Sequence, residues 1–303
     1  MDPSPQTSRV NPLTRNQIDI RLKNCPRLPS LSSINSALRE LLNAEQRYAS
    51  QISDVIRRDP SLTARILRLV NSVYYGLTSP VNSIEEAVFY LGVRQIRQLA
   101  MVTPVIEDFQ RLTGSVSFPW REFWRHCIGV AIMTREVLSG VSSSTDEADY
   151  VAGLVHDVGK IVMAAVFPLH FAAIHQQIGP NNNDLIKIET EVLGLNHQEL
   201  GALYLKNHNL SEVLVTTTRF HHDPSQGGDN SQLAAAVQIA DLLVRHAQIG
   251  NSGNPLPVST DDLINASGWN FLYPGNDQSE RAEIQSLLKR SLDRLPTILE
   301  GLI

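Results

Sequence analysis

The chain of 303 residues is poor in cysteine, because Cys25 and Cys127 are the two it contains and they form no CxxC pair. This scarcity argues against a disulfide framework and against a cysteine zinc site. No apolar run approaches the ~18 residues of a membrane span, and Met1–Asn24 lacks the apolar segment of a secretory signal. We therefore expect a cytoplasmic protein with no membrane partner.

Positive charge is not in excess either. The chain has 26 lysines and arginines against 31 acidic residues, which gives a net charge of -5. A nucleic-acid-binding protein usually shows a basic stripe, and an acidic balance opposes contact with phosphates. The first third is enriched in arginine, at Arg57, Arg58, Arg65, Arg68, Arg94 and Arg97. A solvated helix face accounts for these arginines, so nucleic acid is not an expected partner.

What the sequence does contain is helical periodicity. It is 42% hydrophobic and 19% charged, enough to bury a proper core, and almost everything after Leu31 follows a helical repeat. Asp59 and Pro60 predict a helix start, and Ser83 with Glu86 predicts a capping box that Gly92 should close. The fold class predicted is all-α.

One segment tests this class directly. Residues 213–218 are mostly β-branched and favour a strand by propensity alone. No partner strand is evident in the chain, so we predict a helix there.

The predicted architecture is a two-lobed helical bundle. Residues 1–24 are polar and read as a flexible tail, although Ile18–Leu22 could begin a helix. The first lobe covers residues 25–115, including a helix over 93–109, and the second covers residues 116–250, with the joint near Gly114–Phe118. A C-terminal helical extension over 251–303 ends in an amphipathic helix at Glu280–Leu299.

The most informative motif is Gly153-Leu154-Val155-His156-Asp157-Val158-Gly159-Lys160. An imidazole and a carboxylate at adjacent positions can hold one divalent cation from two directions. Lys160, about one helical turn further on, could then meet a phosphate drawn to that cation. The plain alternative is that His156 and Asp157 only cap and hydrogen-bond a helix end.

Two further polar residues are predicted to point inward. His126 shares a helix face with Phe123, Val130, Met133 and Val137, and Asp241 shares one with Ala234, Val237 and Val244. A lone inward histidine is more often a hydrogen-bonded core residue. A buried carboxylate, however, is costly unless it is paired or binds a metal. Together with the His-Asp pair, these positions indicate a metal site.

The ligand types suit one or two divalent ions, namely Fe, Mn, Zn, Ni or Mg. The candidate donors for a first ion are His126, His156, Asp157 and Asp241, with Glu122 as a further candidate, and those for a second are His197, His221 and His222. Asp157 could bridge two ions and orient a water, and Lys160 could neutralise charge on a phosphoryl group.

Several of these assignments have alternatives. His197 follows the box-like cap of Asn196 and Glu199 and could merely occupy a first helical turn. One of His221 and His222 could be exposed, because adjacent helix residues point about 100° apart. For Glu122, solvation is favoured over coordination.

Several motifs, taken together and in order, resemble the HDOD domain of the HD superfamily of metal-dependent phosphohydrolases. They are Leu28-Pro29-Ser30-Leu31, Asp59-Pro60-Ser61-Leu62-Thr63, Asn71-Ser72, Ser83-Ile84-Glu85-Glu86-Ala87, Leu91-Gly92, Phe123-Trp124-Arg125-His126, the His156–Asp157 motif, Asn196-His197-Gln198-Glu199-Leu200-Gly201 and His221-His222. The resemblance covers about residues 25–250.

The resemblance implies an all-helical regulatory or output module of bacterial signal transduction, with signalling proteins as partners and a nucleotide as a potential ligand. The alternative it implies is an active phosphohydrolase that uses Asp157 and Lys160 on a nucleotide or cyclic dinucleotide. The ligand order also resembles the HD-GYP phosphodiesterases, but Asp223–Asn230 contains no Gly-Tyr-Pro element. That departure argues against hydrolysis of cyclic di-GMP.

Overall fold

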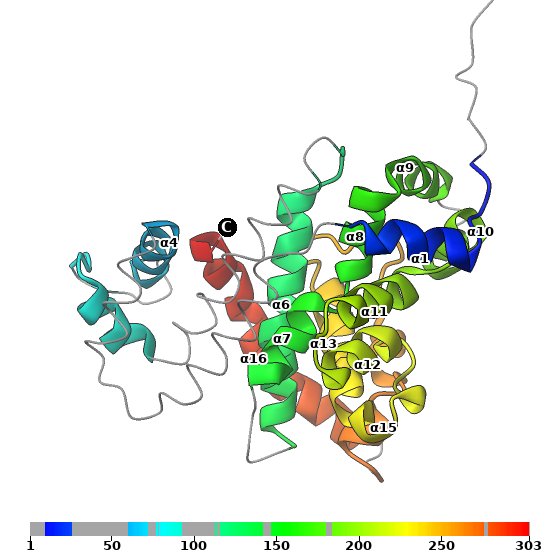
Figure 1. The fold of residues 1–303 in the computed structure, drawn as a ribbon. Coiled ribbons are helices and arrows are strands. Elements are labelled where there is room, and N and C mark those ends of the chain that lie inside the picture. Colours follow the sequence, from blue (N-terminus) through cyan, green and yellow to red (C-terminus); the bar gives the residue numbers. More distant parts are fainter. Residues whose placement is uncertain are drawn as a thin grey trace, which may run out of the picture.

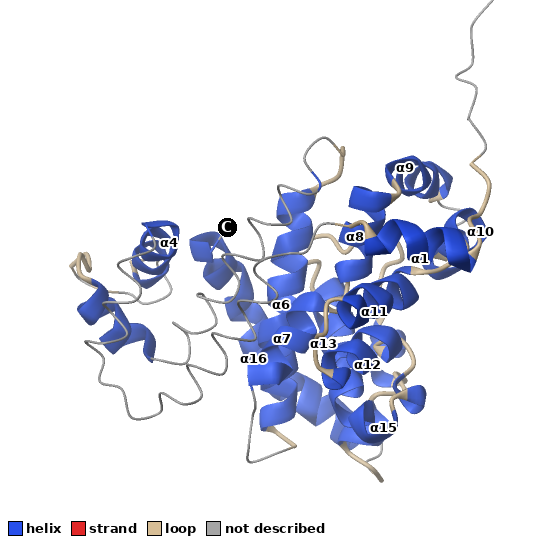
Figure 2. Ribbon diagram, in the orientation of Figure 1, coloured by secondary structure: helices blue, strands red, loops and turns tan. Residues whose placement is uncertain are grey.

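The computed structural model describes residues 10–25, 60–71, 77, 79–92, 113, 116–141, 147–179, 184–275 and 278–302. Helices, turns and loops account for these residues, and no strand occurs among them (Figure 2). The predicted all-α class is therefore confirmed.

Most of the described helices form one packed body (Figure 1). In chain order they are α6 (Trp120–Ser139), α7 (Glu147–Val155), α8 (Val158–Val166), α9 (Pro168–Gln177), α10 (Leu185–Leu193), α11 (His197–Asn207), α12 (Glu212–Phe220), α13 (Ser231–His246), α14 (Thr260–Ile264) and α15 (Trp269–Leu272). Two short 3-10 turns, Pro224–Gln226 and Gly228–Asn230, connect α12 to α13. Helix α6 packs against both α7 and α13, so it lies at the centre of this body.

Helix α1 (Arg15–Lys23) lies in the part of the chain that the sequence assigned to a tail. Thr14 and Gln17 form a capping box at its start, and Ile18 and Leu22 are buried. The backbone N–H of Leu13 also donates to the carbonyl of Leu193, at 2.9 Å. The helix that Ile18–Leu22 could begin is therefore present, and it is attached to the body.

The predicted helix boundaries near residues 60 and 83 can be compared with the structure. Helix α4 (Pro60–Val70) begins at Pro60, whereas its predicted cap Asp59 lies outside the described residues. Residues 84–92 are helical, and the Ser83 hydroxyl accepts a hydrogen bond from the Glu86 N–H at 3.2 Å. Gly92 has φ of 75°, the left-handed conformation expected of a helix end.

Helix α16 (Gln278–Leu302) contacts both α4 and α6. Leu295 and Leu299 are fully buried, which confirms the amphipathic helix predicted at Glu280–Leu299. Figure 1 shows α16 between α4 and the main body. The division into two lobes stays a prediction, because its boundary and the helix expected over 93–109 lie largely outside the described residues.

Helix α12 confirms the prediction of a helix for the β-branched segment. Leu214, Val215, Thr217 and Thr218 are buried, and α12 packs against α7, α11 and α13. Burial on several sides of a helix outweighs the modest strand propensity of valine and threonine.

Among the described residues, no single helix has both the length and the apolar character needed to cross a membrane. Helices α8 and α9 meet that test only when they are joined across a bend of 117°.

Candidate metal centre

His156 and Asp157 occupy the two-residue turn between α7 and α8. Asp157 stands at the N-cap position of α8, yet its side chain makes no capping hydrogen bond. Its Oδ2 instead accepts from the Lys160 ammonium at 2.6 Å. Asp157 therefore does not cap the helix with its side chain, whereas His156 does hydrogen-bond the Gly153 carbonyl near the end of α7.

Three imidazoles are held in one orientation through their Nδ1 atoms. His156 Nδ1 lies 2.8 Å from the Gly153 carbonyl, and His221 Nδ1 lies 2.8 Å from the Thr218 carbonyl. Because a carbonyl can only accept, each Nδ1 carries a proton, which leaves Nε2 as the atom of each ring that can present a lone pair. His197 Nδ1 lies 2.6 Å from the Glu189 carboxylate, which selects the same tautomer.

The Asp157 carboxylate lies at the meeting point of these rings. Its Oδ2 is 3.3 Å from His156 Nε2, and its Oδ1 is 3.3 Å from His197 Nε2 and 3.9 Å from His221 Nε2. His222 approaches the same atom of His197, with 3.2 Å between the two Nε2 atoms. One carboxylate thus faces histidines from three separate chain segments.

His126 on α6 and Asp241 on α13 complete the cluster. His126 Nε2 lies 3.1 Å from Asp241 Oδ1, although the two atoms are not aligned as a hydrogen bond. The second oxygen of Asp241 accepts from Arg245 at 3.4 Å. Both side chains are buried, as their apolar helix faces predicted.

The donor atoms of the cluster lie close enough together to hold a metal ion. Two groups each place one ligand atom per residue within 4.8 Å of the others: His126, His156 and Asp157, and His197, His221 and His222. His156 Nε2, His221 Nε2 and Asp157 Oδ1 are buried with no aligned hydrogen-bond partner in the described part of the chain. Such atoms cost about 1–3 kcal/mol each when left unpaired, and a cation would satisfy them. The residues therefore fit a divalent metal.

The protonation states also suit metal binding. Burial is the largest influence on Asp157 and opposes its ionisation, but Lys160 and His156 outweigh it and hold the pKa of Asp157 well below its usual range. Burial is also the largest influence on Asp241 and raises its pKa. Arg245 and His126 outweigh burial and hold the pKa of Asp241 well below its usual range. Both carboxylates are therefore ionised at neutral pH.

The histidines divide into two classes. Burial lowers the pKa of His126 and His221, and burial together with His197 lowers that of His222 to about 3. These rings are neutral and free to donate a lone pair. His156 differs, because Asp157 outweighs burial and raises the pKa of its ring. A cation at this ring would take the place of the proton.

The chain after α13 covers the cluster. Gly250 has φ of 70°, and a Cβ there would come within 2.4 Å of the Glu122 carbonyl oxygen and the His126 nitrogen. The Asn251 N–H donates to the Glu122 carbonyl at 2.9 Å. Lys160 donates to the Ser252 carbonyl at 2.9 Å. We call residues 249–256 the covering segment, since it contacts the centre through Lys160.

Exposure is correspondingly low. The predicted ligands that are at most 3% exposed are His126, His156, Asp157, His197, His221 and Asp241. His222 is partly exposed, but its Nε2 still meets His197, so neither member of the adjacent pair is fully exposed.

Glu122 does not join the cluster. Its side chain is 47% exposed and lies 3.5 Å from Arg125. The idea that it shares the inward face of His126 was wrong, because a spacing of four residues leaves room for the longer side chain to turn toward solvent. Its contribution is its backbone carbonyl, which holds the covering segment.

The sequence reasoning missed Glu189, which is 2% exposed and holds His197 through both the ring and the backbone N–H, the latter at 2.9 Å. The sequence did contain a signal for Glu189, because this acid lies on the apolar face of α10 with Leu185, Ile188 and Val192. Ser252 was also missed, and no pattern could reveal it, since its contribution is a backbone carbonyl.

Comparison with known proteins identifies the class of this fold. The HDOD domain family model matches residues 28–224, and the chain belongs to that family. An HDOD domain protein of unknown function from Geobacter sulfurreducens superposes with a TM-score of 0.75 at 23% identity, covering 96% of this chain and 99% of that one. At this identity the likeness shows the fold.

Two further proteins are similar to this chain. A "Putative phosphohydrolase" from Shewanella amazonensis SB2B has a TM-score of 0.66 at 24% identity, covering 94% of this chain and 98% of its own. An uncharacterized protein from Treponema pallidum (strain Nichols) is 26% identical over 232 residues, which is 74% of this chain. The chain covers 43% of the length of that relative.

Proposed function

We propose that this chain is a regulatory or output module of bacterial signal transduction whose His/Asp centre binds one or two divalent metal ions. The observation that carries this proposal is the enclosed Asp157. Its two oxygens face histidines of both donor groups, while its partner Lys160 is tied to the covering segment. A cation in this place would connect helices that lie far apart in the chain.

Enclosure favours regulation over turnover. A phosphorylated substrate must reach the ion and the lysine, but Lys160 is 5% exposed and its ammonium already contacts Asp157 and Ser252. Substrate entry would require the covering segment to move and this ion pair to break. A module that reports metal or nucleotide occupancy to a protein partner needs no such entry at the centre.

The first experiment measures metal content. We expect the untagged protein, grown in metal-rich medium, to contain at least one equivalent of Fe, Mn, Zn or Ni by elemental analysis, or to take up Mg in titration. The His156→Ala/Asp157→Ala variant should lose it, because it removes donors of the first group and the shared carboxylate. A wild-type protein that stays metal-free after loading would refute the site.

The matched control is His246→Ala. His246 is exposed and bonds the Val258 carbonyl rather than the cluster, so its loss should leave the metal content unchanged. Circular dichroism of each variant separates loss of metal from loss of fold.

The alternative function is a metal-dependent phosphohydrolase. It is favoured by the two donor groups that meet at Asp157, since two cations side by side can supply Lewis acidity and neutralise charge at a phosphoryl group. In that case Asp157 would hold the ions and position water, and Lys160 would have to exchange Asp157 for the phosphate. Turnover of nucleotide or cyclic dinucleotide substrates by the metal-loaded protein, absent in Lys160→Ala, would select this alternative.

A further inference from the structure

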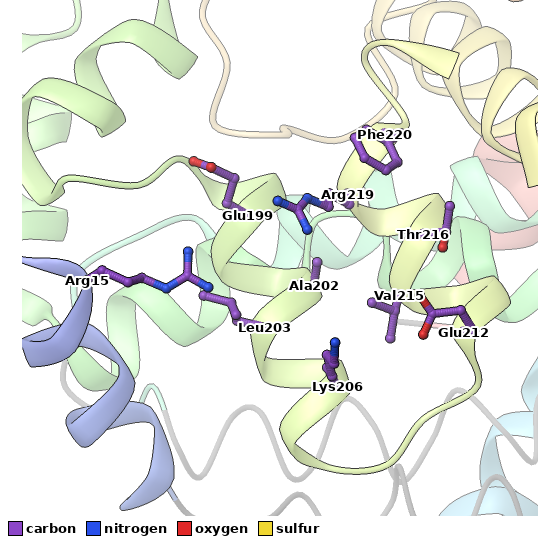
Figure 3. A pocket seen from close by; sticks show the side chains of 10 residues that line it. All are labelled: Arg15, Glu199, Ala202, Leu203, Lys206, Glu212, Val215, Thr216, Arg219 and Phe220. Atoms are coloured by element: carbon purple, nitrogen blue, oxygen red, sulfur yellow. The ribbon is translucent and has the colours of Figure 1, made fainter. Parts of the chain in front are cut away.

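A separate pocket lies between α1, α11 and α12, and none of the residues that line it belongs to the metal centre. Its volume is about 190 Å³. Its floor includes Ala202, Leu203 and Val215, and Phe220 lies at one end (Figure 3). Because this floor is apolar, the charged residues around it determine what the pocket can bind.

Three cationic side chains reach this pocket from three helices. Figure 3 shows Arg15 of α1, Lys206 of α11 and Arg219 of α12 directed toward the space above Ala202 and Leu203. Arg15 lies 3.2 Å from Asp19. No carboxylate pairs with Lys206 or Arg219 among the residues that the structure describes. The guanidinium of Arg219 instead lies 5.6 Å from the centre of the Phe220 ring.

The two acids of the pocket offset part of this charge, and three cations against two carboxylates leave a formal balance of +1. The Glu199 carboxylate is used in the capping box of α11, where it accepts from the Asn196 N–H at 3.3 Å. Glu212 stands in the first turn of α12, where a carboxylate is favoured by the helix dipole. Lys206 and Arg219 are therefore the groups left to meet an anion.

We infer that this pocket binds a small phosphate-bearing molecule. A guanidinium fork and an ammonium that line the same pocket suit the several oxygens of a phosphoryl group. The volume is below the ~300–1,000 Å³ of pockets for drug-sized ligands, so the ligand is a phosphate, a pyrophosphate or a short phosphomonoester rather than a whole dinucleotide. Phe220 offers an apolar surface for the rest of such a molecule.

The pocket is also connected to the metal centre, because residues of α11 and α12 that line it are close in sequence to the histidine donors. Gln198, next to His197, donates to the Arg219 carbonyl at 3.0 Å, and Arg219 precedes His221 by two residues. Movement of α12 on ligand binding would therefore reach two of the donors. The binding inference itself does not depend on the metal.

Isothermal titration of the metal-free protein with inorganic pyrophosphate tests the inference. We expect saturable binding that weakens about tenfold or more in Lys206→Gln/Arg219→Gln, because charge-assisted hydrogen bonds are lost. Glu212→Gln should instead tighten binding by about twofold, since it removes a nearby negative charge. A general loss of structure could not make the affinity for pyrophosphate higher in Glu212→Gln than in the wild type.

The control is Lys289→Gln/Arg290→Gln, which removes the same charge from exposed positions of α16 and should leave the affinity within about twofold. Failure of the wild type to bind pyrophosphate in the millimolar range would overturn the inference. So would binding that survives Lys206→Gln/Arg219→Gln but is lost in His156→Ala/Asp157→Ala, because the anion would then lie in the metal centre. Malonate that binds as tightly as pyrophosphate would overturn the phosphate assignment.

Discussion

At the scale of single residues, the centre depends on its imidazoles and also on the groups that orient them by hydrogen bonds to Nδ1. Backbone carbonyls orient His156 and His221, whereas His197 depends on the Glu189 side chain. Such supporting partners fix the tautomer and raise ligand basicity. Glu189 can be changed without removing any donor, so it offers a test of this support.

We predict that Glu189→Gln weakens metal binding by about 10–100-fold while leaving the number of bound ions unchanged. The amide keeps the shape of the side chain but loses the charge that favours the His197 tautomer. Competition with a chelator measures the affinity. Glu191→Gln is the matched control, because Glu191 lies on the same helix with its side chain 59% exposed. Equal affinities for wild type and Glu189→Gln would contradict the role given to Glu189.

The histidines also predict how the stability of the metal-free protein depends on pH. His126, His221 and His222 of the centre, and His175 outside it, have pKa values below the 6.5 of an unfolded histidine. The unfolded chain therefore binds more protons as the pH falls below 6.5, and each such group lowers the unfolding free energy by up to about 1.4 kcal/mol per pH unit. His156 has a raised pKa and acts in the opposite direction.

Four groups against one give a net loss on acidification. We expect the unfolding free energy of the metal-free protein to fall by roughly 1–4 kcal/mol from pH 6.5 to about 5.5. Urea unfolding at constant ionic strength measures it. His222→Gln should show a shallower decline, since it removes one of the four groups. A stability that rises over this interval would show that the imidazoles are not buried as neutral rings.

At the scale of elements, glycines set how closely the helices that hold the donors approach. A Cβ on Gly159 of α8 would lie 1.8 Å from the His197 carbonyl oxygen and 2.9 Å from the Gly201 nitrogen. The start of α11 therefore rests directly on α8. This contact places His197 beside Asp157, which is why glycine is required in the motif.

We predict that Gly159→Ala destabilises the protein by about 2–4 kcal/mol, because backbone rather than a flexible side chain must move. It should also weaken metal binding by separating His197 from Asp157. Gly179→Ala is the control, since a Cβ at Gly179 would meet nothing within 4 Å. Urea unfolding and chelator competition give the two readouts. Wild-type stability of Gly159→Ala would contradict the close packing of α8 on α11.

The same elements show what the sequence could and could not predict. Periodicity identified the inward positions of His126 and Asp241, and the Asn196–Glu199 capping box placed His197 at a helix start. These are local signals, so a single sequence contains them. The pairing of Lys160 with the Ser252 carbonyl joins residues 92 positions apart. Tertiary packing alone determines that contact, so the sequence could not show that the Lys160 ammonium already has two partners.

At the scale of the whole molecule, the donors come from α6, the turn between α7 and α8, α11, the end of α12, and α13. Chain segments more than a hundred residues apart therefore meet at one point. A cation that binds only the folded arrangement stabilises it by RT ln(1 + [M]/Kd), which is about 4.1 kcal/mol at a thousandfold excess over Kd. Metal occupancy should thus be visible in the cooperative unfolding of the molecule.

We predict that a chelator lowers the melting temperature of the metal-loaded protein by several degrees, and that added metal restores it in proportion to the logarithm of its concentration. Differential scanning calorimetry measures both changes. The His156→Ala/Asp157→Ala variant should show neither response, although its own melting temperature can differ from wild type. If chelation removes the metal and leaves the wild-type transition unmoved, the ion does not connect these helices, because a ligand of the folded state alone must raise its stability.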